Sequence, residues 1–187
     1  MPSLSAFTFI TLNGYYQGPQ PGDISWHRHG KEEAEFSATS LSKDNILLFG
    51  HKTYEMMAGY WPTAQALAQS PVVARGMNQA EKIVFSSSMQ QADWQHTRVI
   101  HTHLVEEIRA LKQQGSKDLT ILGSGSILSL VADHQLIDEY LVMIDPVALG
   151  KGFPIFKGIR HPLNLELQHS RVFPSGTVLL GYKVLAR

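Results

Sequence analysis

The 187-residue sequence has no cysteine, no excess of charge of one sign and no long apolar run. The absence of cysteine excludes disulfide bonds, thiolate metal sites and cysteine nucleophiles. The 16 Lys and Arg residues equal the 16 Asp and Glu residues in number, so the basic excess typical of nucleic-acid-binding proteins is missing. No segment approaches the ~20 apolar residues that a membrane-spanning helix requires.

The start of the chain also lacks the features of a secretory leader, because residues 1–7 carry neither a basic segment nor a long apolar run. The composition, with 43% hydrophobic and 17% charged residues, is that of a folded protein. The length suits one domain. We therefore expect a single cytoplasmic domain over residues 1–187 that binds neither nucleic acid nor a membrane.

Two common nucleotide-binding motifs are missing as well. There is no complete Gly-x-Gly-x-x-Gly at the opening of a first strand–helix unit, which disfavours a standard Rossmann domain. There is no Gly-x-x-x-x-Gly-Lys-Ser/Thr, which excludes a P-loop protein.

Short apolar runs alternate with helical patterns along the chain, and this alternation predicts an α/β domain. A long polar loop over 15–29 interrupts the pattern, and Pro71 breaks one of the helices. The expected strands are 4–12, 45–49, 82–85, 97–100, 118–122 and 139–144, the expected helices are 30–41, 53–58, 64–77, 103–114 and 127–133, and 163–173 with 177–185 form a closing hairpin.

Three of these strands stop at small or hydroxyl-bearing residues, and two of the three junctions open a helix. Ligands of open α/β sheets bind outside the carboxyl ends of the strands, where helix N-termini present free N–H groups to phosphates. Together the junctions suggest a phosphate-rich ligand such as a dinucleotide, although each one alone is equally well explained as a flexible turn or a polar strand end. The three junctions are Gly50-His51-Lys52-Thr53, Ser86-Ser87-Ser88 and Gly123-Ser124-Gly125-Ser126.

Five segments, in order along nearly the whole chain, resemble motifs of the dihydrofolate-reductase-like superfamily. Within it, the chain is most similar to the C-terminal reductase domain of the bifunctional deaminase–reductase of riboflavin biosynthesis and to the stand-alone relatives of that domain. The segments are Thr11-Leu12-Asn13-Gly14-Tyr15, Phe49-Gly50-His51-Lys52-Thr53-Tyr54-Glu55, Val84-Phe85-Ser86-Ser87-Ser88, Ile121-Leu122-Gly123-Ser124-Gly125-Ser126, and Asp138-Glu139-Tyr140 with Pro146-Val147-Ala148-Leu149-Gly150-Lys151-Gly152.

This resemblance implies a three-layer fold, with helices on both faces of a mixed, mostly parallel sheet that ends in an antiparallel C-terminal hairpin. It implies NADPH, or alternatively NADH, across the carboxyl ends of the strands. It also implies hydride transfer to a pyrimidine, a pterin or a ribosylaminopyrimidine. The residues that it assigns to the cofactor are Asn13, Gly14, Gly50, His51, Lys52, Thr53, Ser86, Ser87, Ser88, Gly123, Ser124, Gly125 and Ser126.

Two departures from the family pattern bear on the choice between NADPH and NADH. His51 and Ser87 stand where the family carries arginines that contact the 2′-phosphate of NADPH. Arginine binds phosphate with two parallel hydrogen bonds and is always charged, whereas histidine is charged only part of the time near neutrality. Lys52 and the neighbouring serines keep NADPH as the expected cofactor.

The substrate is expected between the loop after the first strand and the helix that follows it. The resemblance assigns Glu35 to hold a ring nitrogen of the substrate or to relay a proton to it, with Glu32, one helical turn earlier, as the competitor. Trp26 and Phe36 are the further candidates for substrate binding, and Trp26 is equally suited to anchor the loop. The glutamates are equally well explained as a solvated helix face.

The pairs His27/His29 and His101/His103 lack a third ligand at standard spacing, so we expect no metal site. The resemblance implies a homodimer. Two alternatives to the reductase stay open: a non-catalytic dinucleotide-binding module with the same fold, and a true dihydrofolate reductase.

Overall fold

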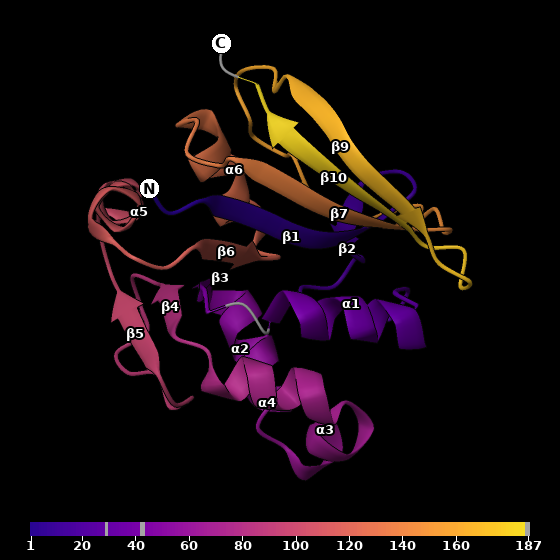
Figure 1. Cartoon of the computed structure of the whole chain (residues 1–187), viewed down its shortest axis with the longest axis horizontal. Coiled ribbons are helices and arrows are strands. Elements are labelled where there is room, and N and C mark those ends of the chain that lie inside the picture. The colour runs from indigo at the N-terminus through magenta and orange to yellow at the C-terminus, as the bar shows by residue number, and fades with distance from the viewer. Residues whose placement is uncertain (29, 42–43, 186–187) are drawn as a thin grey trace.

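A central eight-stranded sheet organises the computed structural model of the chain, which describes residues 1–28, 30–41 and 44–185 (Figure 1). Its strands are β1 (Leu4–Thr11), β3 (Ile46–Gly50), β4 (Lys82–Phe85), β5 (Thr97–Ile100), β6 (Leu119–Leu122), β7 (Glu139–Asp145), β9 (Leu165–Val172) and β10 (Val178–Val184). They lie in the order β5-β4-β3-β6-β1-β7-β10-β9.

The six strands from β5 to β7 in this order are all parallel to their neighbours. Strand β10 is antiparallel to both β7 and β9, and it closes the sheet as a hairpin. The mixed, mostly parallel sheet with an antiparallel C-terminal hairpin is therefore confirmed. Because the six strands are parallel, the carboxyl ends of β1, β3, β4, β6 and β7 meet at one edge.

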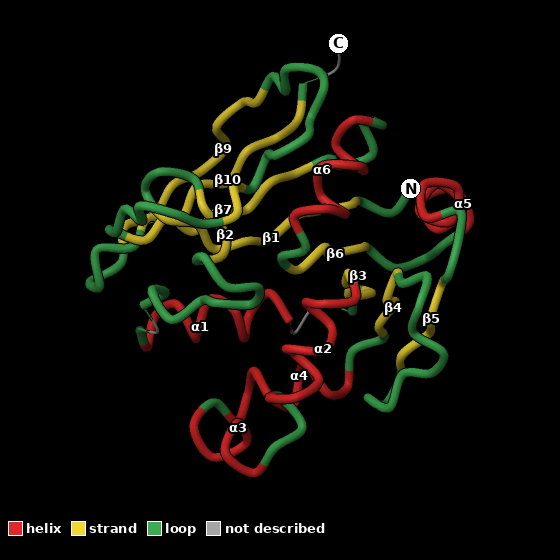
Figure 2. Tube along the Cα trace, turned by 180° about the vertical axis from the view of Figure 1, so that it is seen from behind, coloured by secondary structure: helices red, strands yellow, loops and turns green. Residues whose placement is uncertain are grey.

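Helices cover both faces of the sheet, so that the fold has three layers. Helices α5 and α6 pack on one face, and α1, α2 and α4 pack on the other; Figures 1 and 2 show the latter three on the same side from opposite views. The helices are α1 (Lys31–Leu41), α2 (His51–Tyr60), α3 (Ala64–Gln69), α4 (Pro71–Gln79), α5 (Leu104–Gln114) and α6 (Gly125–Asp133).

Strand β3 shows how the sequence produces these layers. Successive side chains of a strand point to opposite faces, so Leu47 and Phe49 pack beneath α2 and α4, while Leu48 packs on the α5 and α6 side. All three side chains are fully buried, and each contributes about 1.5–3 kcal/mol by leaving water. An apolar run without alternation is typical of a strand covered on both faces.

Pro71 splits the segment expected to be one helix over 64–77. Proline has no backbone N–H to continue the hydrogen bonds of helix α3, which ends at Gln69. Its fixed φ suits the first position of the next helix, α4. The helix expected from residue 53 begins two residues earlier, at His51, directly after the strand. Among the described residues, no helix has the length and apolarity needed to cross a membrane.

The loop expected over 15–29 contains a short strand that the sequence pattern did not indicate. Strand β2 (Tyr15–Gln17) pairs with β8 (Phe153–Pro154) in a separate two-stranded sheet. Gly152 makes this pairing possible, because a Cβ there would lie 2.5 Å from the carbonyl oxygen of Gln17. The pairing joins the start of the loop to a segment more than a hundred residues away in the sequence. A local sequence pattern does not predict such a pairing.

Candidate functional site

A cleft of about 1240 Å³ runs between α1 and the face of the central strands, and reaches the carboxyl ends of the strands. Most of its exposed wall is apolar, with Phe7 and Phe9 of β1 among the lining residues. Four of the predicted site residues line it: Glu35, Thr53, Gly123 and Ser124. Large clefts with apolar walls and a few polar groups are the usual sites of small-molecule binding.

The ends of β3 and β6 are linked directly at one end of this cleft. The backbone N–H of Gly50 donates a hydrogen bond to Ser124 Oγ at 2.7 Å. A Cβ on residue 50 would lie 3.1 Å from the same oxygen, so the two loops approach as closely as they do because residue 50 is glycine. Two of the three predicted junctions thus form one surface.

The junction after β6 has the backbone geometry of an anion-binding turn. Gly123 and Ser124 both have a left-handed backbone, with φ of 59° and 57°, a conformation that non-glycine residues rarely adopt and that clusters at functional sites. Helix α6 begins at Gly125, and its first N–H groups have no partners within the helix. Their orientation and the helix dipole favour a phosphate there.

Tyr16 lies against this junction. Burial raises the pKa of the Tyr16 phenol, and a hydrogen bond donated by the Gly125 backbone N–H to the phenol oxygen acts in the opposite direction. A Cβ on residue 125 would lie 2.7 Å from the Tyr16 ring. The close approach of Tyr16 therefore leaves no room for a side chain at residue 125, independently of the role predicted for this glycine.

The third junction, after β4, meets the start of α2 through His51. The Ser86 and Ser88 hydroxyls lie 3.0 Å and 3.2 Å from His51 Nδ1, and His51 Nε2 lies 3.1 Å from a carboxylate oxygen of Glu55. Two more predicted residues are exposed at this end, Ser87 beside the serines and Lys52, whose ammonium lies 3.6 Å from Glu55.

Asn13 and Gly14 form the turn expected at the end of β1. Asn13 Nδ2 donates to the carbonyl of Leu149, and the Thr11 hydroxyl donates to Asn13 Oδ1, both at 2.8 Å. Gly14 has a φ of 83°, which explains glycine at this position. Asn13 therefore ties the first strand to the segment after β7.

The glutamates of α1 occupy three different environments. The Glu35 carboxylate is 63% exposed at the rim of the cleft, 3.9 Å from the Lys31 ammonium. Glu32 forms an ion pair with Arg171 at 2.6 Å. Glu33, to which no role was assigned, is buried, lines the cleft and accepts a hydrogen bond from the Ser175 hydroxyl. The helix therefore presents two carboxylates to the cleft, Glu33 inside and Glu35 at the rim.

The other candidates for substrate binding, Trp26, Glu32 and Phe36, are not among the described residues that line the cleft. Phe36 packs with Phe7, at 6.0 Å between ring centres, in the cluster behind the cleft wall. The indole N–H of Trp26 donates to the carbonyl of Asp23 and anchors the loop. Their assignment to the substrate stays a prediction.

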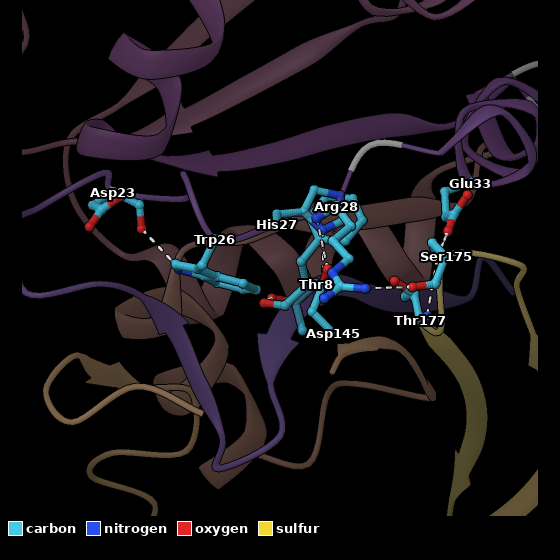
Figure 3. A network of polar contacts seen from close by, with 10 residues as sticks. Thr8, Asp23, Trp26, His27, Arg28, Glu33, Asp145, Ser175 and Thr177 are labelled. Atoms are coloured by element: carbon cyan, nitrogen blue, oxygen red, sulfur yellow. Dashed lines mark hydrogen bonds and ion pairs between the residues drawn. The ribbon is translucent and has the colours of Figure 1, made fainter. Parts of the chain in front are cut away.

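A buried His27–Asp145 pair is the feature of the cleft that sequence reasoning missed (Figure 3). His27 Nδ1 lies 2.8 Å from Asp145 Oδ2, and the Arg28 backbone N–H donates to Asp145 Oδ1 at the same distance. His27 lines the cleft, with its ring stacked on Phe9. The sequence offers one indication of it: Asp145 is an acidic residue that directly follows the apolar run 140–144.

The described residues contain no group of three His, Asp or Glu side chains that could hold a metal ion. His29, the predicted neighbour of His27, lies outside the described residues. The donor set at the strand ends does fit a dinucleotide: a left-handed turn opens a helix N-terminus at one junction, and serine hydroxyls surround a histidine at another.

Comparison with known proteins gives consistent results. A family model, described as the RibD C-terminal domain, matches residues 2–179. An uncharacterized protein of Bacillus subtilis, YyaP, is 27% identical over 174 residues, which are 92% of this chain and 90% of that protein.

Two solved structures share the fold. A putative riboflavin biosynthesis protein from Shewanella superposes with a TM-score of 0.75 at 18% identity, covering 98% of this chain and 99% of that one. Dihydrofolate reductase from Enterococcus faecalis, solved in complex with NADP(H), superposes with a TM-score of 0.67 at 17% identity, covering 97% and 96% of the two chains.

Proposed function

The chain belongs to the RibD C-terminal domain family, and from that premise we propose that it is an NADPH-dependent reductase of a small ring compound. The substrate class is a pyrimidine, a pterin or a ribosylaminopyrimidine, with 5-amino-6-(5-phosphoribosylamino)uracil as the first candidate. The observation that carries the proposal is the cleft itself, which has a phosphate-type turn at the strand ends and buried acid–base groups further along the same wall.

The strand ends supply the groups that hold the cofactor in this proposal. Gly123 and Ser124 shape the turn, and Gly125 and Ser126 present the first N–H groups of α6 to the pyrophosphate. Thr53 lines the cleft beside this turn and Gly50 bonds Ser124, and the proposal keeps Asn13 and Gly14 as further cofactor residues. When bound, NADPH supplies the hydride, and the protein supplies orientation and electrostatics.

The serine junction supplies selectivity for the 2′-phosphate. His51, Lys52, Ser86, Ser87 and Ser88 place hydroxyl, imidazole and ammonium donors at this end of the cleft. Phosphate oxygens accept hydrogen bonds from all three kinds of group. NADH stays the alternative, since Glu55 brings a negative charge to His51.

The cleft wall at α1 supplies the groups that hold the substrate. Glu35, at the rim, accepts a hydrogen bond from a ring N–H of the substrate and fixes the orientation of the ring. Reduction of a C=N or C=O group requires a proton as well as a hydride, so an acid must also reach the ring. The homodimer implied by the family resemblance stays a prediction.

The test measures cofactor binding and turnover separately. NADPH binding is followed by the fluorescence of the dihydronicotinamide, and its oxidation by absorbance, with 5-amino-6-(5-phosphoribosylamino)uracil and dihydrofolate as acceptors. Binding together with oxidation by either acceptor is the expected result. Absence of NADPH and NADH binding would overturn the proposal, and binding without oxidation would favour the non-catalytic module.

A further inference from the structure

His27 occupies a position in the cleft that packing alone does not require. Its side chain is 3% exposed, yet it lies in the loop between β2 and α1 rather than in a helix or strand. The imidazole stacks on the Phe9 ring, with 3.8 Å between ring centres and 28° between planes. Since both rings line the cleft, a planar ligand bound along β1 would meet the histidine beside an aromatic face.

Asp145 fixes which nitrogen of this ring carries a permanent proton. A carboxylate only accepts hydrogen bonds, and Asp145 accepts one from the Arg28 backbone N–H through Oδ1 and faces His27 Nδ1 through Oδ2. Nδ1 is therefore the donor of the pair, and Nε2 is the nitrogen that would act on a bound molecule. The carboxylate, which is fully buried, holds the ring in this orientation.

The cost of this arrangement indicates a role beyond stability. Two charged groups taken out of water lose hydration that their mutual attraction often fails to recover, so a buried ion pair is weak evidence for stabilisation. Here the carboxylate ends the central strand β7, and the imidazole forms part of the cleft wall. A histidine oriented by a buried carboxylate is the usual arrangement for moving a proton to or from a bound molecule.

We propose that His27 is the proton donor of the reduction and that Asp145 is its positioning residue. This inference rests on the proposed function. The carbon of a C=N or C=O group gains a hydride with both of its electrons, and the π electrons move to the nitrogen or oxygen. That atom bonds the proton as the Nε2–H bond of His27 breaks. The imidazole becomes neutral, and water returns the proton after the product leaves.

Charged groups from each neighbouring element bear on this step. Strand β7 contributes Asp145, helix α1 contributes the buried Glu33, and Arg28 follows His27 in the loop. The Arg28 guanidinium donates to the carbonyl of Ser175, whose hydroxyl donates to Glu33, so these groups form one network (Figure 3). Glu35 stays outside this network, at the rim, where it orients the substrate.

The first experiment needs no substrate. In ¹⁵N-imidazole NMR of the wild-type protein with NADP⁺ present, the neutral His27 ring should carry its proton at Nδ1, which faces Asp145. Asp145→Asn should allow the proton to move between the two nitrogens. A neutral wild-type ring that carries its proton at Nε2 overturns the proposal even if the enzyme is active.

The second experiment measures turnover with whichever acceptor oxidises NADPH. His27→Gln should lower kcat by about 10²- to 10⁴-fold, remove the alkaline limb of the pH profile, because a proton donor acts only while it is protonated, and leave the NADPH dissociation constant unchanged. His134→Gln, at the exposed end of α6, is the matched control and should be silent. A kcat within twofold of wild type overturns the role of His27. No turnover by wild type overturns only the proposed function, since the NMR experiment tests the His27–Asp145 pair without a substrate.

Discussion

The two ends of the cleft are built from different kinds of group. At the ends of β3, β4 and β6, the contacts are backbone N–H groups, serine hydroxyls and glycines, and they join residues 35 to 74 positions apart. Around the end of β7, ionisable residues are joined across 117 to 147 positions. The first region repeats one kind of loop after successive strands, whereas the second depends on single side chains. Substitutions should therefore separate binding of the cofactor from turnover.

After His27→Gln, the largest effect is expected at the rim carboxylate. Glu35→Gln keeps the shape of the side chain and removes its charge, so turnover should fall by roughly ten- to a thousandfold with NADPH affinity little changed. Steady-state kinetics and fluorescence titration measure the two quantities.

Glu32→Gln is the matched control and should be nearly silent, because Glu32 faces Arg171. Glu33→Gln decides between the two carboxylates of the cleft. If this variant loses turnover while Glu35→Gln does not, the buried carboxylate holds the substrate and the assignment of Glu35 is wrong.

The next effect concerns the other end of the cleft. Gly125→Val should weaken NADPH binding by roughly ten- to a hundredfold, because the loss of one hydrogen bond to a charged group corresponds to about 1.5–3 kcal/mol. Since the added side chain also meets Tyr16, the substitution is repeated in a Tyr16→Ala background.

Gly150→Val serves as the control, because a Cβ there has no neighbour within 4 Å. Unchanged NADPH affinity in folded Gly125→Val protein would remove the turn after β6 from the site. The position of the His27 ring proton in ¹⁵N NMR should be the same in this variant, since the two regions share no contact used in either assignment.

A stability prediction concerns Lys82, the first residue of β4. Its buried ammonium donates to the carbonyls of Met77, Asn78 and Ala80 at the end of α4. Lys82→Met should lower the free energy of unfolding by about 1–3 kcal/mol, because these carbonyls lose their donor. Urea unfolding at pH 7 measures the change, and Lys183→Met, at an exposed lysine of strand β10, is the control.

The pH dependence of stability tests the same residue. Burial lowers the pKa of Lys82 to about 8, while a lysine in an unfolded chain titrates near 10.4. The unfolded state therefore binds more protons between these values, and the contribution of Lys82 to stability rises as the pH increases through this window. The difference between wild type and Lys82→Met should widen from pH 8 to pH 10. A constant difference would contradict the assignment.

The smallest effect is a change in cofactor preference. If His51 contacts the 2′-phosphate, His51→Arg should raise the preference for NADPH over NADH a few-fold, because arginine is always charged and binds phosphate with two parallel hydrogen bonds. Glu55→Gln should also raise it, because a negative charge beside His51 is removed. The ratio of the NADPH and NADH dissociation constants measures the change, and a ratio unchanged in both variants would assign the discrimination to Lys52 or the serines.

Sequence patterns predicted the fold and the strand-end junctions because both are formed by residues that are close together in the sequence. Strands β4 and β5 have the bounds expected from their apolar runs, and β3 and β6 are shifted by only one residue at one or both ends. The His27–Asp145 pair could not be predicted in this way, since its two residues are 118 positions apart. The choice among the glutamates of α1 was open for a related reason: helical spacing gives the face of a side chain only once the packing of the helix is known.

The Tyr16 hydroxyl at the start of α6 has a consequence for the kinetics of cofactor exchange. It already takes the hydrogen bond of Gly125 that an incoming phosphate would use. In the proposed function, binding would replace one acceptor by another, and the observed affinity would be the difference between the two. A phenol that returned to its partner as the dinucleotide left would also shorten the residence time of the product, a benefit wherever release limits the rate of the cycle.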